Sequence, residues 1–233
     1  MPQNDAASVP GMDAALSKAL ARRLRHEVGD FLQKVYASVA ILQGRLPAEW
    51  RQERDILTRL RRQAEACKDF LDTLQDFLSP ARLSLEPFDL AGLTAGLARE
   101  TQGRWPGLEI QTEASGPVTV LGDFERIGQV GRLLLTNACE AARRRVTWRT
   151  TATPETRQAE WTLQDDGPGV PPEMMDRLFT PFFSTRPDHA GLGLALARKL
   201  VLLHAGRLTV ANVPGGGFQV KIILPQGPEP SGQ

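Results

Sequence analysis

The sequence predicts an α+β protein in two parts, a helical hairpin followed by a domain of mixed helices and strands. Residues 13–79 contain one proline, Pro47, and their apolar residues recur at spacings of three and four, which is typical of amphipathic helices. From Pro87 onward, short runs typical of strands alternate with helical segments and turns rich in glycine and proline. The chain of 233 residues is long enough for two modest domains.

The N-terminal part is expected to form two helices, at about 13–46 and 49–78. Val28, Val35 and Leu42 lie seven residues apart in the first helix, in the manner of a heptad stripe. The second helix carries a longer apolar stripe: Leu57, Leu60, Ala64, Cys67, Leu71, Leu74 and Leu78. Because a hairpin gives each helix only one partner, apolar surface would remain exposed. We therefore expect a homodimer in which two hairpins form a four-helix bundle.

The second part, residues 87–226, is expected to be a mixed sheet with helices over one face. A linker at 80–86 precedes it, and tails at 1–12 and 227–233 are expected to be disordered. The predicted helices lie at 90–100, 124–144 and 192–204. The predicted strands lie at 108–111, 118–121, 146–151, 160–164, 207–212 and 218–224, the last two as a hairpin.

The composition excludes several classes of protein. A formal net charge of +1 gives no reason to expect nucleic acid or an anionic membrane as a partner. The two cysteines, Cys67 and Cys139, lie in apolar helical patterns and cannot form a disulfide framework. No stretch approaches the ~20 apolar residues that cross a bilayer, and the N-terminus lacks the layout of a signal peptide. We expect a cytoplasmic protein without a membrane span in this chain.

Three segments of the second part carry candidate chemistry. Asn137 lies inside the apolar helical run LLLTNACEAA, where its amide needs a polar partner. Asp165 opens the turn DDGPG directly after a strand, and its carboxylate can accept from an exocyclic amine such as that of adenine. The segment Gly191–Leu194, GLGL, opens a helix whose first N–H groups suit phosphates. Each segment by itself also has a simpler interpretation. Asn137 could be a hydrogen-bonded residue on a helix surface, DDGPG a surface turn and GLGL an ordinary helix start.

In this order, with Phe179, Phe182 and Phe183 between them, the segments resemble the nucleotide-binding domain shared by histidine kinases, gyrase, Hsp90 and MutL. The resemblance covers roughly residues 87–225 and implies an α/β sandwich of the Bergerat or GHKL type. It implies ATP and Mg²⁺ as cofactors, with Asn137 as the metal ligand and residues 170–190 as a mobile lid anchored by the three phenylalanines. The residues that it implies in ATP binding are Asn137, Asp165, Gly167, Gly169, Phe183, Gly191, Leu192, Gly193 and Leu194.

The first helix carries His26 followed by Glu27. With Val28 at heptad position a, His26 falls at position f on the outer face, where a lone histidine is also compatible with an inert surface residue. Upstream of an ATP-type domain, however, the pair resembles the H-box of two-component sensor histidine kinases. The resemblance implies that His26 is autophosphorylated from ATP, with Glu27 orienting the ring and accepting its N–H proton. The phosphoryl group would then pass to an aspartate of a response regulator receiver domain, and a separate sensory protein is a further candidate partner.

Three positions depart from the family pattern. Leu133 stands where ATP-hydrolysing relatives carry a water-activating glutamate, which favours transfer to a side chain. Asp30 stands four residues after His26, where Thr, Asn or Gln is usual, so we expect weak or altered phosphatase activity toward the partner. His189, which we expect to be exposed, and Ala190 precede GLGL where a further glycine is common.

Three alternative functions fit parts of the sequence. A histidine phosphotransferase with a degenerate ATP-like domain would relay phosphate between regulators, but such proteins lose the nucleotide motifs that are all present here. A protein-serine kinase of the same ATP fold would lack the histidine-bearing hairpin. A non-catalytic dimeric scaffold would not bind ATP, which a titration decides.

Overall fold

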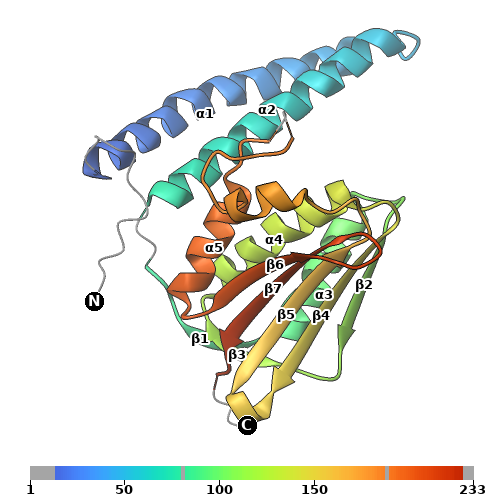
Figure 1. The fold of residues 1–233 in the computed structure, drawn as a ribbon. Helices are drawn as coiled ribbons and strands as arrows, with labels where there is room; N and C mark the ends of the chain where they lie inside the picture. Colours follow the sequence, from blue (N-terminus) through green and yellow to red (C-terminus); the bar gives the residue numbers. More distant parts are fainter. Residues whose placement is uncertain (1–13, 80–81, 187–188, 228–233) are drawn as a thin grey trace, which may run out of the picture. The chain divides into compact units, whose positions relative to one another are not determined.

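The structure is a computed structural model that describes residues 14–79, 82–186 and 189–227. The chain divides into two compact units, Met1–Pro80 and Ala81–Gln233 (Figure 1). The predicted tail at 1–12, all but residue 227 of the predicted tail at 227–233, and the start of the predicted linker lie outside the described residues.

The N-terminal unit is a hairpin of two long helices, α1 (Ala14–Arg45) and α2 (Arg51–Leu78), close to the predicted bounds. The turn between them is held by Arg54 of α2. Its Nη1 donates hydrogen bonds to the backbone carbonyl oxygens of Gln43 (3.4 Å) and Leu46 (3.0 Å). These bonds satisfy carbonyls that the last turn of a helix leaves without an intrahelical partner.

The row of α1 that faces α2 differs from the predicted heptad stripe. Leu32 forms a buried core with residues of α2, and Val28 and Val35 pack against that core. Leu42, predicted in the same row, is 49% exposed, and Phe31 is 62% exposed. A straight helix drifts by about 20° per heptad, so a strict seven-residue row turns away from its partner helix. The hairpin thus leaves apolar side chains of α1 uncovered.

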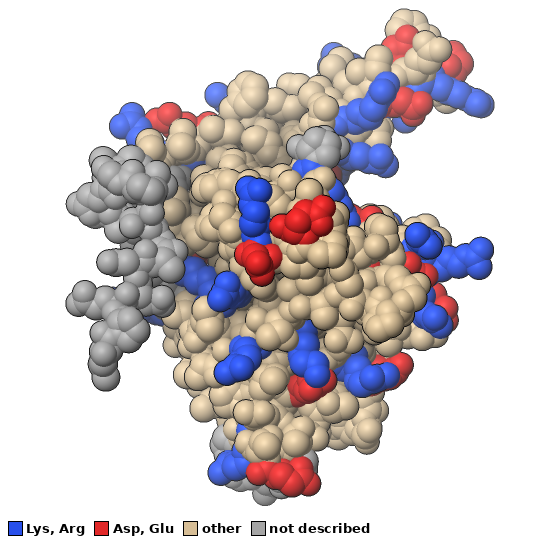
Figure 2. Space-filling model, viewed as in Figure 1, with Lys and Arg blue, Asp and Glu red and all other residues tan. Residues whose placement is uncertain are grey.

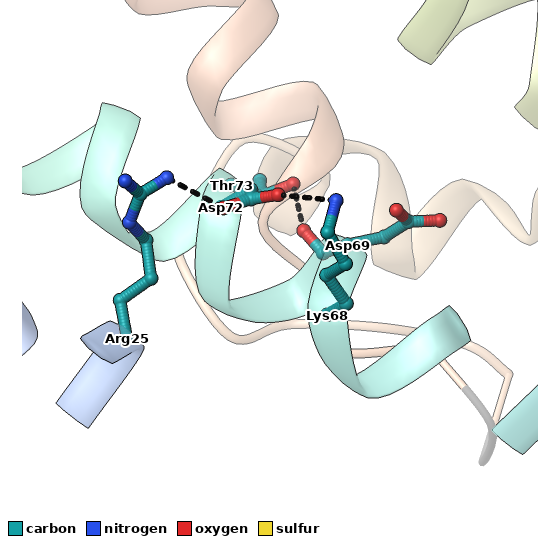
Figure 3. A network of polar contacts seen from close by, with 5 residues as sticks. All are labelled: Arg25, Lys68, Asp69, Asp72 and Thr73. Atoms are coloured by element: carbon teal, nitrogen blue, oxygen red, sulfur yellow. Dashed lines mark hydrogen bonds and ion pairs between the residues drawn. The ribbon is translucent and has the colours of Figure 1, made fainter. Parts of the chain in front are cut away.

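A polar network ties the two helices together in the first half of α1 (Figure 3). Arg25 Nη1 of α1 donates to Asp72 Oδ1 of α2 at 3.0 Å, and Lys68 Nζ donates to Asp72 Oδ2 at 3.2 Å. Both oxygens of Asp72 are therefore occupied by cations. The Arg25–Asp72 pair fixes the position of α1 against α2 one residue before His26.

The second unit contains a five-stranded mixed sheet in the order β2-β4-β5-β7-β6, with β2 and β4 parallel and the other pairs antiparallel. Its strands are β2 (Glu109–Ala114), β4 (Arg145–Thr153), β5 (Gln158–Asp165), β6 (Arg207–Asn212) and β7 (Phe218–Pro225). A separate antiparallel pair is formed by β3 (Thr119–Gly122) and β1 (Glu86–Asp89), of which β1 was not predicted. Two short 3₁₀ helices, also not predicted, are η1 (Pro154–Thr156) and η2 (Pro172–Arg177).

Three helices cover one face of the sheet, as predicted (Figure 1). They are α3 (Leu90–Gln102), α4 (Phe124–Ala141) and α5 (Gly193–Leu203). Beneath them Trp148 and Trp161 stack with ring centroids 4.8 Å apart, and Trp161 Nε1 donates to Thr94 Oγ1 of α3 at 2.7 Å. The buried indole N–H is thus satisfied, which removes the cost of burying it.

The helix α4 is three residues shorter than predicted. Its predicted end was Arg144, but the helix ends at Ala141. Asp166 Oδ1 accepts hydrogen bonds from the backbone N–H groups of Arg143 (2.8 Å) and Arg144 (3.1 Å), which takes these residues out of the helix. Burial raises the pKa of Asp166, but the backbone N–H groups outweigh burial and hold the pKa below its usual value.

The start of α4 is set by Asp123 and by His204 at the end of α5. Asp123 Oδ1 accepts from the N–H of Arg126 at 3.0 Å as the N-cap of α4. The N–H of Asp123 donates to Nε2 of His204 (3.0 Å), whose Nδ1 lies 2.7 Å from the carbonyl oxygen of Leu200. This pattern fits a neutral ring with its proton on Nδ1, and the buried His204 thus links the end of α5 to the start of α4.

Charged side chains of both signs are interspersed over the face that Figure 2 shows. This agrees with the near-zero net charge of the sequence. Over the residues that the structure describes, no helix combines the length and the hydropathy needed to cross a bilayer.

Candidate functional site

The C-terminal half of α4 carries Asn137 and borders Gly167 and Gly193, three of the residues predicted to bind nucleotide. Asn137 is half-buried there, and no residue in the described part of the chain forms a hydrogen bond with its side-chain amide. Gly193, the first residue of α5, faces this amide. A Cβ atom added at Gly193 would lie 3.8 Å from Asn137 Nδ2 and 3.8 Å from Leu133 Cδ2. The space that Gly193 leaves is therefore bordered by one polar amide and one apolar side chain.

Asp165, at the end of β5, is only 4% exposed. Its Oδ1 accepts from the N–H groups of Gly167 (2.8 Å) and Phe218 (3.3 Å), whereas Oδ2 accepts from none of the described residues. Burial raises the pKa of Asp165, and the two backbone N–H groups offset part of that rise. A buried carboxylate with one oxygen left over is suited to accept from an amine of a ligand.

The turn that follows Asp165 is held between α4 and β6. A Cβ atom added at Gly167 would lie 2.5 Å from the carbonyl oxygen of Ala141, at the end of α4. Gly169 has φ +75°, in the left-handed region, and a Cβ there would lie 2.7 Å from Asn212 Oδ1. These glycines are thus needed for packing within the protein, whatever they do for a ligand.

Asn212 is a contributor to this turn that the sequence analysis missed. Its Nδ2 donates to the carbonyl oxygen of Val170 at 2.7 Å, and its Oδ1 accepts from the N–H of Val170 at 2.8 Å. This two-way bridge fixes the backbone that leaves the DDGPG turn. Nothing in the sequence distinguishes Asn212 from other polar residues at strand ends.

The segment before α5 turns sharply at Gly191. Its φ is +68°, and a Cβ atom there would collide with the backbone carbonyl of Phe183. The carbonyl oxygen of Gly191 accepts from the N–H of Phe182 at 3.0 Å, which joins the two ends of the segment 182–191. Gly191 is therefore required by the backbone path that brings Phe183 beside the start of α5.

The phenylalanines and leucines of this segment differ in placement. The rings of Phe179 and Phe183 are half-buried, with the Cζ atoms of Arg198 at 4.9 Å and of Arg177 at 4.3 Å from their centroids. In contrast, Phe182 is 58% exposed. The following GLGL segment buries Leu192 almost completely and Leu194 partly. A contact of Leu192 with a ligand would therefore have to come from its backbone.

A carboxylate that the sequence analysis did not select connects this segment to α4. Glu140 lies three residues after Asn137, and its Oε2 is 2.7 Å from Arg186 Nη1 and 3.3 Å from His189 Nε2. His189 was predicted to be exposed, and this was wrong: it is half-buried because it packs toward Glu140.

His26 and Glu27 lie on α1 in the helical unit. The side chain of His26 is 79% exposed, in agreement with the predicted outward position. Its Nδ1 lies 3.4 Å from Asp30 Oδ2, one helical turn further on. Glu27, predicted to orient the ring, instead accepts a hydrogen bond from Arg23 Nε at 2.9 Å. The carboxylate at the imidazole is therefore that of Asp30.

Known proteins resemble this chain in sequence. Residues 122–228 match the family described as histidine kinase-, DNA gyrase B- and HSP90-like ATPase. The sensor histidine kinase ZraS of Salmonella typhimurium is 27% identical over 214 residues, which cover 88% of this chain and 45% of that protein. The adaptive-response sensory kinase SasA of Parasynechococcus marenigrum is 33% identical over 193 residues, covering 75% and 49%. This chain thus spans about half the length of these curated relatives.

Solved structures are similar in fold. A mycobacterial sensor histidine kinase, MprB, is 30% identical with a TM-score of 0.56, and the match covers 62% of this chain and 99% of that chain. Full-length ShkA, solved in complex with AMPPNP, is 28% identical with a TM-score of 0.75, covering 91% of this chain and 46% of that chain. The chain belongs to the sensor histidine kinases, with an ATPase domain of the type shared with DNA gyrase B and HSP90.

Proposed function

We propose that this chain binds ATP with Mg²⁺ in its second unit and transfers the γ-phosphoryl group to His26. The phosphoryl group then passes to an aspartate of a response regulator. The observation that carries the proposal is the half-buried amide of Asn137, which has no hydrogen-bond partner among the described residues and faces Gly193 at the amino end of α5. A polar group left in this way needs a ligand or water, and the first N–H groups of a helix attract phosphate.

The residues present suit both ATP and a metal ion. Asp165 offers Oδ2 to the exocyclic amine of adenine, because among the described residues only its Oδ1 accepts hydrogen bonds. Asn137 offers a neutral oxygen ligand, and Mg²⁺ typically needs few protein ligands when phosphate oxygens and water complete its shell. The metal would neutralise charge on the phosphates during transfer.

The second half of the site would hold the phosphates. Gly193 leaves the amino end of α5 without a side chain, so backbone N–H groups of Gly193 and Leu194 are open to phosphate oxygens. Gly167, Gly169 and Gly191 shape the backbone around the nucleotide, and Phe183 anchors the loop that covers it. The roles of Leu192 and Leu194 are proposed to lie in their backbone.

The exposed imidazole of His26 is the proposed acceptor. Its neutral Nε2 attacks the γ-phosphorus in line, forming an N–P bond as the P–O bond to ADP breaks and its electron pair stays with ADP. The exposure of the ring leaves it open to approach by a separate domain.

The chemistry of α4 favours transfer over hydrolysis. The residue one turn before Asn137 that borders the space at Gly193 is Leu133. An apolar side chain there cannot remove a proton from water, so water attack lacks a general base at this position.

The partners proposed are a second copy of the chain and the receiver domain of a response regulator. The uncovered apolar residues of the hairpin, Leu24, Phe31, Ile41, Leu42, Ile56 and Leu60, are the surface that a dimeric four-helix bundle would bury. A separate sensory protein is a further proposed partner. Because ATP is the donor, we place the reaction in the cytoplasm.

The test is incubation of the chain with γ-labelled ATP and Mg²⁺. Label that is stable to base and labile to acid is expected on the wild type and absent from His26→Ala and Asn137→Ala. Matched controls are Lys34→Ala and Thr136→Ala, which alter exposed neighbours on the same two helices and should keep the label. Label that survives in His26→Ala would overturn the proposal.

A further inference from the structure

The imidazole of His26 is bordered by a groove of about 740 Å³ on the surface of the helical hairpin. Both helices line it, α1 with His26, Gly29 and Asp30, and α2 with Lys68 and Asp72. All of these residues belong to one compact unit, so their mutual positions are fixed within it. The side chains that line this groove are the groups of the hairpin that lie near the imidazole of His26.

The helix geometry selects Asp30 as the carboxylate that meets the ring. Residues four apart lie on the same face of a helix, whereas consecutive residues are about 100° apart around its axis. Accordingly, Nδ1 of His26 lies 3.4 Å from Oδ2 of Asp30, while the carboxylate of Glu27 is held by Arg23 Nε at 2.9 Å.

The other charged residues that line the groove do not compete with His26 for the carboxylate of Asp30. Arg25 and Lys68 both bind Asp72, at 3.0 and 3.2 Å, and Arg23 binds Glu27. Arg22 is the further cation that lines the groove. No residue in the described part of the chain other than His26 forms an ion pair or hydrogen bond with Asp30. Its carboxylate is therefore available to the ring.

We propose that Asp30, rather than Glu27, is the residue that positions the imidazole of His26 for phosphorylation, an inference that rests on the function proposed above. A carboxylate at Nδ1 stabilises the tautomer with its proton on Nδ1 and the free electron pair on Nε2. The ring is then held with its nucleophilic nitrogen directed away from the helix.

The proton at Nδ1 stays in place during the transfer. When Nε2 of His26 forms the N–P bond, ADP leaves with the electron pair of the broken P–O bond and the ring becomes positively charged. Asp30 compensates that charge through Nδ1–H. In the onward transfer to an aspartate, the N–P electron pair returns to Nε2 and the neutral ring again carries its proton on Nδ1. Asp30 therefore acts without accepting the proton.

The first test measures the ring itself. The chain has three histidines, and His26→Ala identifies the signals of His26 in ¹⁵N NMR spectra of the unphosphorylated full chain. The wild type is expected to show mainly the Nδ1–H tautomer. Asp30→Asn should shift the population toward Nε2–H, whereas Glu27→Gln should leave it unchanged. An unchanged tautomer in Asp30→Asn, with a shift in Glu27→Gln, would assign the role to Glu27 and overturn the proposal.

The second test measures phosphorylation. Asp30→Asn is expected to lower kcat for autophosphorylation by about tenfold and to leave the KM for ATP unchanged, because Asp30 does not contact nucleotide. Asp30→Glu should restore most of the rate, since it keeps a carboxylate on the same face. Asp55→Asn, an exposed aspartate of α2 outside the groove, is the charge-matched control. A wild-type rate in Asp30→Asn would contradict the proposal.

The two tests separate this proposal from the proposed function. If the wild-type chain takes no label from ATP, the kinase activity is refuted, while the tautomer of His26 still decides whether Asp30 holds the ring.

Discussion

Arg186 and Glu140 form an ion pair in which Nη1 and Oε2 are 2.7 Å apart, and this pair joins the segment before α5 to the helix that carries Asn137. His189 Nε2 lies 3.3 Å from the same oxygen. We call Glu140, Arg186 and His189 the latch. Because Glu140 lies one turn beyond Asn137, we expect movement of this segment to affect the residue proposed to bind the metal ion.

Breaking the latch is expected to loosen the segment without unfolding the domain. In Glu140→Gln the partners lose a charged acceptor, so amide hydrogen exchange of Phe182 and Phe183 should accelerate. The free energy of unfolding should fall by no more than about 1 kcal/mol, because the pair is only partly buried. Glu160→Gln, which removes an ion pair with Lys221 on the sheet, is the matched control and should leave exchange at Phe182 unchanged. Equal exchange in Glu140→Gln and the wild type would contradict the coupling.

Two glycines at the start of α5 are predicted to differ in how much stability an alanine substitution costs. Gly191→Ala forces a left-handed backbone on a residue with a Cβ, which costs about 1–2 kcal/mol before the collision with Phe183 is counted. Gly193→Ala meets only ordinary contacts at 3.8 Å, so thermal unfolding should change little.

Gly193→Ala should bind nucleotide more weakly than the wild type. The new methyl group of Gly193→Ala would occupy the space beside Asn137, so calorimetric titration with an ATP analogue should show weaker binding to a stably folded domain. Undiminished affinity in Gly193→Ala would show that nucleotide does not enter this space.

Nucleotide affinity is predicted to fall on mild acidification because of Asp165. Burial raises the pKa of this carboxyl above its ordinary value, so it gains a proton, and loses its acceptor charge, at a higher pH than an exposed aspartate. The same sign applies to stability: the burial penalty is present near neutral pH and is relieved as pH falls through the raised pKa.

Binding measured across this pH range checks the assignment. Asp165→Asn should bind nucleotide weakly and with little dependence on acidification. Asp166→Asn is the neighbouring control, because backbone N–H groups keep the pKa of Asp166 below its usual value and it stays ionised in this range. An equal loss of pH dependence in Asp166→Asn would argue against Asp165 as the titrating group.

The two thiols are predicted to differ in reactivity. Burial raises the pKa of Cys139 to about 11, with Glu140 adding to the rise, so its thiol stays protonated and enclosed near neutral pH. Cys67, half-buried on α2, should react with a thiol reagent first. Kinetics of labelling in the folded chain, compared with Cys139→Ser and Cys67→Ser, measure this directly. Two equally fast thiols in the wild type would contradict the burial of Cys139.

Much of the fold follows from local sequence signals. The apolar spacing of α1 and α2 predicted both helices to within two residues, and β6 agrees with its predicted bounds, because helices and strands impose their own periods on a buried face. The strand β1 was missed, since its four residues, EPFD, include a proline and bury little. The end of α4 was overestimated because Asp166, 22 residues beyond Arg144, captures its backbone.

The residues of the site also fall into two groups: those that a local sequence motif identifies, and those whose role depends on contacts between distant parts of the sequence. The positions of Asn137, Asp165 and the glycines could be selected from motifs, which are contiguous in sequence. The latch could not be predicted from the sequence, because Glu140 and Arg186 are 46 residues apart and neither lies in a distinctive sequence pattern. Likewise, the helix period places Asp30 beside His26, but the pairing of Glu27 with Arg23 depends on how several charged side chains share one surface.

The central claim is that the γ-phosphoryl group of ATP comes to rest on His26. Tandem mass spectrometry of the full chain, digested at neutral pH after incubation with ATP and Mg²⁺, tests it most directly. The account predicts one added phosphoryl group, localised by its fragments to His26 and absent from Asn137→Ala. A phosphoryl group on a serine, a threonine or another histidine, or a chain that binds ATP and remains unmodified, would contradict it.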